Sequence, residues 1–370
     1  MNFDFSDELK QLRDQARRFL AEQCPPTAVR RVLEGEASYD RALWLKLAEM
    51  GWLGAAVPEA FGGAGLGHEG LCVLAEELGR ALAPVPFASS IYLAAETIMF
   101  AGSPAQKEAY LPKLASGERI GTLALAEGQG NPDPRRIETT VSGGRISGLK
   151  LPVTDGGIAD LAIVLARESG LLALFLVDLT GPGVVREAVA TIDPSRDHAR
   201  ITLTDAPAER LGAAGEGWAI TRRALDRAAI LVAFEQIGGA QACLEMARDY
   251  ALERYAFGRP IGSFQAIKHK LADVYIATEL ARSNAYYGAW ALAGDAAELP
   301  VAAASARVAA TEAFHLASKE NIQTHGGMGF TWAGDCHLYY RRAKHLALTL
   351  GSAPWWQDRL IAELEARNAR

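Results

Sequence analysis

The sequence predicts a mainly α-helical protein with a β domain in its middle. Apolar residues recur at helical spacing in the first third of the chain. The middle changes to short segments rich in Val, Ile, Leu and Thr, and Gly, Pro and Asp separate these segments. Long periodic segments return near residue 216 and continue from there. We therefore expect an N-terminal helical domain (1–118), a central β domain (119–212) and a C-terminal helical bundle (213–370).

Local signals place the first helices. Ser6 is a good N-cap, and the acidic Asp7 and Glu8 in the first turn favour the helix dipole. Asp40 should cap a second helix, which Gly51 should end. Apolar periodicity predicts further helices at about 68–82, 87–101 and 104–116.

The middle and the last part of the chain differ in their period. Six short apolar runs predict a compact antiparallel β domain: 119–127, 144–150, 160–166, 171–178, 183–191 and 199–204. Four long segments with short Gly- or Pro-containing joints predict a four-helix bundle: 216–256, 264–293, 298–325 and 335–368.

Composition excludes several classes of function. A net charge of −6 over 370 residues argues against a protein-wide surface for nucleic acid or anionic membrane, although a local basic pocket for a phosphorylated ligand is compatible with it. The four cysteines are far apart and have no CxxC spacing, so we expect reduced thiols and neither a zinc site nor any other metal site. The N-terminus does not have the pattern of a secretory signal. The most apolar stretch, 81–102, contains two prolines and a glutamate, so we expect no membrane span and a cytoplasmic protein.

Three segments carry the chemistry. They are GWLGAAVPEAFGG at 51–63, RYAFGRPIGSFQA at 254–266 and QTHGGMGF at 323–330. The glycines of the third segment can end a helix and leave backbone N–H groups open to a phosphate, or they can form a plain helix C-cap. Arg254 can bind a phosphate with two hydrogen bonds, or it can be an ordinary surface cation.

In their order and separation these segments resemble the FAD-dependent acyl-CoA dehydrogenase family, from residue 1 to about residue 352. The resemblance implies a helical N-terminal domain, a β-barrel and a C-terminal four-helix bundle, which agrees with the pattern of elements. It also implies an oxidoreductase of lipid metabolism that removes hydrogen from the α and β carbons of an acyl-CoA. The electrons would pass from FAD to an electron-transferring flavoprotein.

The resemblance also implies which residues hold FAD. Gln323, Gly326 and Gly327 would meet its pyrophosphate and ribose across a subunit interface. Arg254 would bind a phosphate, Phe257 would pack on the cofactor and Gln265 would hydrogen-bond to it. Backbone groups of Leu125 and Ala126 would meet the pyrimidine side of the flavin, and Thr154 would contact flavin N5. Ser352 is the last of the residues that the resemblance assigns to FAD binding.

Two positions depart from the family pattern around the flavin. Pro152 replaces the tryptophan that normally covers the ring, and Ala126 replaces a threonine. One face of the flavin should therefore be less shielded in this chain.

The usual catalytic base is missing. The reaction needs a carboxylate to take the α-proton of the thioester. Alignment on Arg341 and Lys344 puts Leu350 where most members have glutamate, so only its backbone N–H can act there, by polarising the thioester carbonyl. A minority, similar to isovaleryl-CoA dehydrogenase, carry the glutamate on the first bundle helix, where this chain has Ala228. The adjacent arginine position is Ala229.

Glu235 is the candidate base that remains. It lies seven residues after Ala228, two helical turns along the same face, among apolar residues. Burying a carboxylate there is costly without a partner or a raised pKa, which marks a functional candidate. It is equally compatible with a carboxylate at a subunit contact or one that points outward. Asp226 and His345 are weaker candidates.

Three functions follow from these observations. The first is an acyl-CoA dehydrogenase with Glu235 as base, acting on a bulky, branched or ring-bearing acyl group. The second is a non-catalytic subunit that completes a neighbour's FAD site in a heterotetramer. The third is a related flavin oxidase or monooxygenase. The split cofactor site implies at least a dimer, homo- or hetero-oligomeric, and most simply a tetramer.

Overall fold

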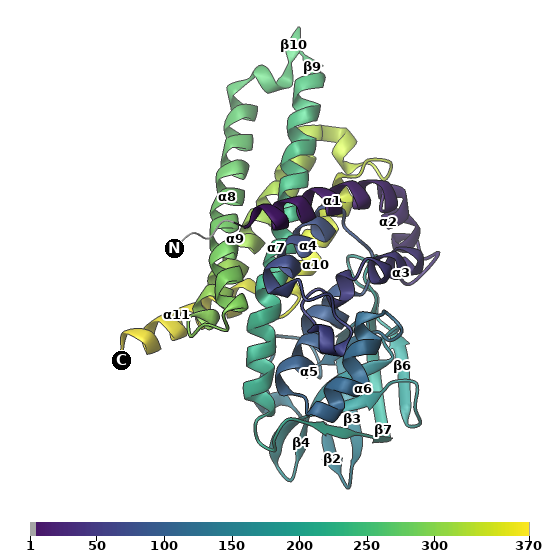
Figure 1. The fold of residues 1–370 in the computed structure, drawn as a ribbon. Coiled ribbons are helices and arrows are strands. Elements are labelled where there is room, and N and C mark those ends of the chain that lie inside the picture. The colour runs from purple at the N-terminus through teal and green to yellow at the C-terminus, as the bar shows by residue number, and fades with distance from the viewer. Residues whose placement is uncertain (1–4, 370) are drawn as a thin grey trace. The chain divides into compact units, whose positions relative to one another are not determined.

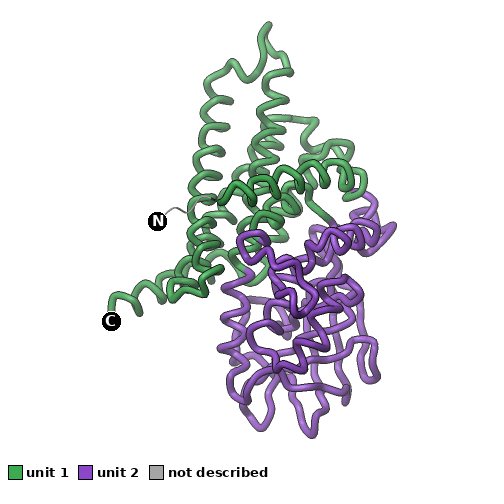
Figure 2. Tube along the Cα trace, viewed as in Figure 1, with its two compact units in different colours: residues 1–29, 72–83, 229–370 green, residues 30–71, 84–228 purple. Residues whose placement is uncertain are grey.

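The structure is a computed structural model that describes residues 5–369. These residues divide into two compact units (Figure 2). The first unit comprises 5–29, 72–83 and 229–369, and the second comprises 30–71 and 84–228.

From residue 5 onward, six α-helices precede the sheet (Figure 1). They are α1 (Asp7–Gln23), α2 (Pro26–Leu33), α3 (Arg41–Glu49), α4 (Gly67–Arg80), α5 (Glu96–Ala101) and α6 (Pro104–Ala115). Both expected N-caps are confirmed. The Leu9 N–H donates to Ser6 Oγ at 3.3 Å, and the Leu43 N–H donates to Asp40 Oδ1 at 3.0 Å.

The expected helix at 87–101 has two parts, a π-helix at Ala88–Ala95 and then α5. All eight residues of the π-helix are buried, so no polar face marks its change of period in the sequence. Helix α2 was not predicted. It has only eight residues, too few for a clear helical pattern.

The middle of the chain forms one eight-stranded sheet in the order β6-β7-β3-β2-β4-β5-β8, and β1 pairs with β4. The strands are β1 (Gly121–Ala124), β2 (Thr140–Ser142), β3 (Arg145–Thr154), β4 (Leu161–Glu168), β5 (Leu171–Asp178), β6 (Val184–Ala188), β7 (His198–Pro207) and β8 (Glu209–Leu211). Strands β3 and β7 pair antiparallel, as do β4 and β5, but β4 runs parallel to both β1 and β2. The expected antiparallel β domain is therefore a mixed sheet, and the antiparallel expectation was wrong for the pairs of β4 with β1 and β2.

Strand β4 is a buried, central strand of this sheet. Its first six residues, 161–166, are all buried, as expected for a strand covered on both faces. The strands of this sheet that the sequence did not predict, β2 and β8, have three residues each, too few to show an alternating pattern.

Long helices make up the last part of the chain. They are α7 (Gly217–Glu253), α8 (Gln265–Ala293), α9 (Leu299–His325), α10 (Cys336–Leu348) and α11 (Ala353–Asn368). A small hairpin, β9 (Tyr255–Ala256) with β10 (Arg259–Pro260), joins the end of α7 to α8 (Figure 1). Of the four expected segments, the last is interrupted at residues 349–352, because Leu350 takes a left-handed φ of 67° that no α-helix accommodates.

No helix among residues 5–369 combines the length and the apolarity that a membrane crossing requires.

Candidate active site

The β9–β10 hairpin presents the second sequence motif at one end of the first unit. Arg254 and Gln265 are exposed, and Phe257 is 96% exposed with a φ of 53°. The Ile261 N–H donates to the Arg254 carbonyl at 2.7 Å, which closes the hairpin at its base. Phe257 therefore presents its ring to solvent in the turn of the hairpin.

The third motif lies close to the second. Helix α9 ends at His325, whose ring stacks on Tyr250 of α7 with centroids 4.2 Å apart. Gly326 follows with φ 60° and ψ −133°, a conformation that essentially only glycine adopts. A Cβ at Gly326 or Gly327 would meet nothing within 4 Å, so the backbone here is open to a ligand.

Together the two motifs form a set of groups suited to a dinucleotide. An exposed guanidinium, two exposed carboxamides and an open glycine backbone are the groups that bind phosphates and ribose hydroxyls. They come from Arg254, Gln265, Gln323 and the Gly326–Gly327 turn, all on the first unit. The donor set and the open backbone at the glycines fit the pyrophosphate half of FAD.

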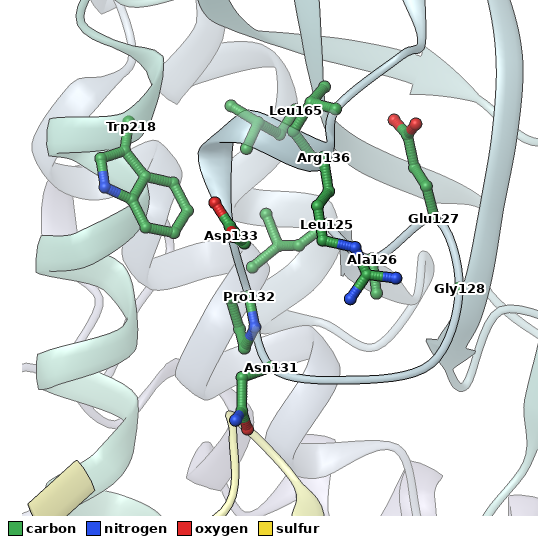
Figure 3. A pocket seen from close by; sticks show the side chains of 11 residues that line it. Leu125, Ala126, Glu127, Gly128, Asn131, Pro132, Asp133, Arg136, Leu165 and Trp218 are labelled. Carbon is green, nitrogen blue, oxygen red and sulfur yellow. The ribbon is translucent and has the colours of Figure 1, made fainter. Parts of the chain in front are cut away.

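The residues expected at the flavin lie in the second unit. Leu125 and Ala126 help to line a pocket just after β1 (Figure 3). Its full lining is Leu125, Ala126, Glu127, Gly128, Asn131, Pro132, Asp133, Arg136, Ile137, Leu165 and Trp218. The sequence had not pointed to Asp133, Arg136 or Trp218, because none of them belongs to a recognisable motif.

A buried lysine fixes the backbone of this pocket. Lys150 is fully buried on β3, and its ammonium donates to the Glu127 carboxylate at 2.6 Å and to the carbonyls of Leu125 (3.3 Å) and Leu165 (2.5 Å). Burial lowers the pKa of Lys150 to about 8, although the hydrogen bond and the charge of Glu127 oppose that shift. Burial alone would raise the pKa of Glu127, but the hydrogen bond and charge of Lys150, together with hydrogen bonds from Thr139 and the Glu138 backbone, lower this pKa.

Thr154 ends β3, close to a histidine. Its Oγ1 is 3.4 Å from His198 Nε2, and its carbonyl accepts a hydrogen bond from the Thr122 hydroxyl at 2.7 Å. Pro152, at the position of the family tryptophan, is exposed, lies within the register shift of the β3–β7 pair between Lys150 and Val153, and follows a cis peptide bond.

Leu350 lies in a tight turn between α10 and α11. Gly351 is buried and has a φ of 108°. Ser352 occupies the N-cap position of α11 without a side-chain capping bond. His345 is buried one turn before Leu350, with its Nε2 3.5 Å from Thr349 Oγ1.

Glu235 is 1% exposed in the middle of α7. Its charge acts on Arg307 of α9, another fully buried side chain: burial lowers the pKa of Arg307 to about 9, and Glu235 opposes that shift. The outward-pointing alternative for Glu235 is therefore wrong for the chain alone, since the core of the first unit encloses it. Ala228 and Ala229 are buried, and so is Asp226.

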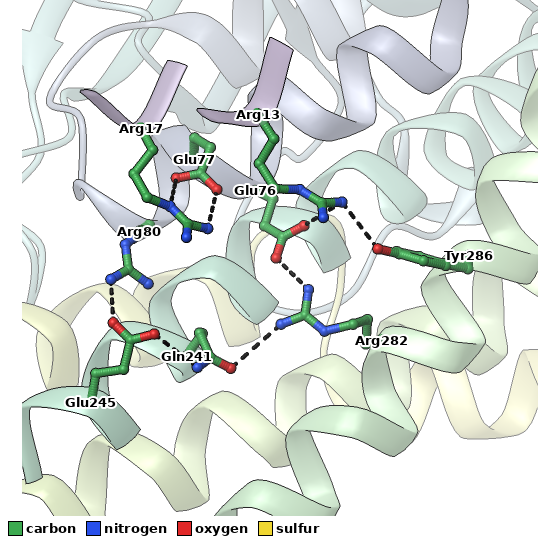
Figure 4. A network of polar contacts seen from close by, with 9 residues as sticks. All are labelled: Arg13, Arg17, Glu76, Glu77, Arg80, Gln241, Glu245, Arg282 and Tyr286. Atoms are coloured by element: carbon green, nitrogen blue, oxygen red, sulfur yellow. Dashed lines mark hydrogen bonds and ion pairs between the residues drawn. The ribbon is translucent and has the colours of Figure 1, made fainter. Parts of the chain in front are cut away.

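A second pocket, of about 470 Å³, lies in the first unit beside a network of ion pairs. Arg17 donates to Glu77 at 2.7 Å, and Arg80 pairs with Glu245 (Figure 4). The network continues through Glu76, Arg282, Gln241, Arg13 and Tyr286. Because its acidic and basic groups face one another, we interpret it as a structural tie between α1, α4, α7 and α8.

Among residues 5–369, no group of three or more His, Cys, Asp or Glu side chains is arranged to hold a metal ion.

Comparison with known proteins identifies the family. Residues 6–118 match the acyl-CoA dehydrogenase N-terminal domain, and residues 215–363 match the acyl-CoA dehydrogenase C-terminal domain. The chain is 37% identical over 361 residues to acyl-CoA dehydrogenase IpdE2 of Mycobacterium tuberculosis, covering 97% of this chain and 98% of that protein. The chain belongs to the acyl-CoA dehydrogenase family.

Two solved structures agree with the fold. The Tcur3481–Tcur3483 steroid ACAD, in a variant form, is similar with a TM-score of 0.89 and 35% identity, over 98% of this chain and 99% of that chain. The ChsE4–ChsE5 complex from Mycobacterium tuberculosis is similar with a TM-score of 0.90 and 30% identity, over 99% of each chain. The expected fold class is confirmed.

Membership of the acyl-CoA dehydrogenase family confirms three further expectations. The chain is an oxidoreductase of the flavoprotein type, its cofactor is FAD and its substrate is an acyl-CoA.

Proposed function

We propose that this acyl-CoA dehydrogenase acts on a bulky, branched or ring-bearing acyl-CoA, with Glu235 as the base. An electron-transferring flavoprotein would take the electrons onward. The proposal includes a cytoplasmic location and the division of the chain at 1–118, 119–212 and 213–370.

The FAD-dependent part of this proposal rests on a set of exposed residues of the first unit, which we call the cofactor surface. Arg254, Gln265, Gln323 and the Gly326–Gly327 turn present donors to solvent, and Phe257 presents an uncovered ring. A surface of this kind suits the phosphates and ribose of an FAD shared with a second chain. Within the second unit, Thr154 and the backbone of Leu125 and Ala126 would bind the flavin. FAD supplies the acceptor for the hydride from the β carbon.

The base assignment rests on burial and charge. Glu235 is the carboxylate of α7 whose charge acts on Arg307, and Arg307 donates to the Thr349 carbonyl, directly before Leu350. In this proposal a Glu235 carboxylate oxygen takes the α-proton, while the Leu350 N–H donates to the thioester carbonyl and stabilises the developing negative charge.

Two observations support a ring-bearing acyl group: the position of the proposed base and the description of one similar structure. A base two turns away from the Ala228 position leaves more room than the usual arrangement, which suits a ring-bearing acyl group better than a plain fatty chain. A protein described as a steroid ACAD is among the similar structures.

The second candidate function is that of a non-catalytic partner subunit. The observation that favours it is the absence of a carboxylate at both usual base positions, Leu350 and Ala228. Similar structures include pairs of different chains, Tcur3481–Tcur3483 and ChsE4–ChsE5. In that case another chain would supply the base.

Anaerobic titration with a panel of acyl-CoAs tests the proposal. The purified protein should be yellow, and a ring-bearing acyl-CoA should bleach its flavin more completely than a straight-chain acyl-CoA of equal carbon number. Bleaching only after co-expression with a second chain would favour the partner-subunit function. Equal bleaching by straight-chain substrates would contradict the proposed acyl group.

A further inference from the structure

The turn that follows α10 has an unusual backbone. Leu350 has a φ of 67°, in the left-handed region that leucine rarely adopts. A Cβ on Gly351 would lie 2.8 Å from the Trp355 ring, so this turn also packs closely on α11. A strained turn persists only where its surroundings fix it.

Arg307 is the group that fixes it. The side chain is 1% exposed, and its Nη2 donates to the Thr349 carbonyl at 2.7 Å and also to the Leu346 carbonyl. Its Nη1 donates to Gln236 Oε1 at 2.5 Å and to Thr311 Oγ1 at 3.1 Å. One guanidinium therefore ties the end of α10 to α7 and α9.

The bond to Thr349 also determines where the next N–H points. The Thr349 carbonyl and the Leu350 N–H belong to one planar trans peptide, so they point in opposite directions. When Arg307 holds the oxygen, it sets the direction of the Leu350 N–H. The positive charge of the guanidinium beside this oxygen also polarises the peptide and makes the Leu350 N–H a stronger donor.

Glu235 supplies the balancing charge. Burying an isolated guanidinium is costly, and the negative charge of Glu235 favours the protonated form of Arg307. Both side chains lie inside the first unit.

We propose that Arg307 is a positioning residue for the thioester: through the Thr349 carbonyl it orients and strengthens the Leu350 N–H as donor to the thioester oxygen. This inference rests on the proposed function. It explains how a chain without glutamate at position 350 can still polarise its substrate there.

Acetoacetyl-CoA is a suitable probe, because its C2 proton is acidic and its enolate carries charge on the thioester oxygen. A bound enolate beside oxidised flavin absorbs at long wavelength, so titration with pH gives the apparent pKa of the bound probe. We would compare the FAD-loaded parent with Arg307→Lys and Arg307→Met. Arg282→Met is the control, because Arg282 is a largely buried guanidinium of the same unit whose partners are Glu76, Glu279 and Gln241.

We expect Arg307→Met to raise the apparent pKa of the bound probe by about one pH unit, a roughly tenfold loss of enolate stabilisation and less than deleting a donor outright. Arg307→Lys should lie between Met and the parent, and Arg282→Met should match the parent. Hydrogen exchange of residues 346–352 should be faster in both Arg307 variants. If Arg307→Met does not fold, Arg307→Lys carries the test.

Two outcomes overturn the inference. If the FAD-loaded Arg307 variants give the same apparent pKa for the bound probe as the parent, the role of Arg307 is contradicted and the proposed function is not affected. A parent whose flavin spectrum acetoacetyl-CoA leaves unchanged would sink the proposed function and the inference with it.

Discussion

Gly79 of α4 lies so close to Glu235 of α7 that a Cβ at position 79 would fall 2.0 Å from the Glu235 carbonyl oxygen. The contact is reciprocal, because a Cβ on Gly238 would fall 1.8 Å from the Glu76 carbonyl oxygen. Only glycine allows the two helix backbones to approach this closely. The two glycines, Gly79 and Gly238, therefore let α4 and α7 pack closely at Glu235.

We predict that Gly79→Ala lowers the free energy of unfolding by about 1–3 kcal/mol, because the added methyl must push the two backbones apart. Urea unfolding of the FAD-loaded protein measures the change. Gly294→Ala is the control: its nearest neighbour would be 3.5 Å from the new Cβ, so its stability should equal or exceed that of the parent. Equal midpoints for Gly79→Ala and the parent would contradict the close approach.

The sequence predicted the features that local chemistry determines. Ser6 and Asp40 cap their helices, as hydroxyl and carboxylate side chains do before an amphipathic segment. The break at Leu350 was not predicted, since leucine carries no signal for a left-handed backbone. Arg307, 43 positions away along the chain, donates to the Thr349 carbonyl within that break, and this bond is a tertiary contact that no local pattern reveals.

The buried pair of Lys150 and Glu127 shows the same limit. A lysine in a strand normally faces solvent, and no periodic pattern reveals that a glutamate after another strand will face it. For the candidate site, the family motifs pointed to the cofactor-binding residues. The pocket residues Asp133, Arg136 and Trp218 emerged only from the fold.

Lys150 should make stability depend on pH in the alkaline range. Its folded pKa, about 8, lies below the ordinary value of 10.5, so between these values the unfolded chain binds more protons than the folded one. The free energy of unfolding of the parent, relative to Lys150→Met, should therefore rise with pH across this window, by at most about 1.4 kcal/mol per pH unit. Urea unfolding at several pH values measures it. A flat difference would mean that Lys150 titrates normally.

Arg254 should contribute to FAD affinity. We predict that Arg254→Ala weakens FAD binding by about 1.5–3 kcal/mol, the usual effect of losing a charge-assisted hydrogen bond. FAD retained after dialysis, followed by its absorbance, measures the effect. Arg248→Ala removes another exposed guanidinium from the same part of the chain and should retain FAD like the parent. Full retention by Arg254→Ala would remove Arg254 from the cofactor site.

The cofactor surface also predicts the assembly. Phe257 is 96% exposed and Phe330 80% exposed, near donors that we assign to an FAD shared with a second chain. We expect at least a dimer, and most simply a tetramer, whose FAD content falls when it is diluted to monomers. Light scattering after size exclusion, with the FAD-to-protein ratio across the peak, measures both. A monomer with a full complement of FAD would contradict a shared site.

Glu235 is the residue on which the proposed chemistry depends. Glu235→Gln keeps the size and most of the hydrogen bonding of the side chain, so the fold, FAD and acyl-CoA affinity should survive. Flavin reduction by a ring-bearing acyl-CoA should slow by about a hundredfold or more, the scale for removing a positioned general base. Stopped-flow absorbance measures the rate. Glu245→Gln, on the same helix and paired with Arg80, is the matched control and should reduce at the parent rate.

A glutamate returned to the common family position provides the complementary test. Leu350→Glu in the Glu235→Gln background should recover part of the rate, because the flavin and the thioester donors would still be in place. Glutamate also tolerates the left-handed backbone there no worse than leucine does. If Glu235→Gln reduces as fast as the parent, the base lies elsewhere in this chain or in another chain. If the flavin is reduced neither in the parent nor in Glu235→Gln but is reduced in the double variant, the natural chain lacks its own base. The partner-subunit function is then the correct one.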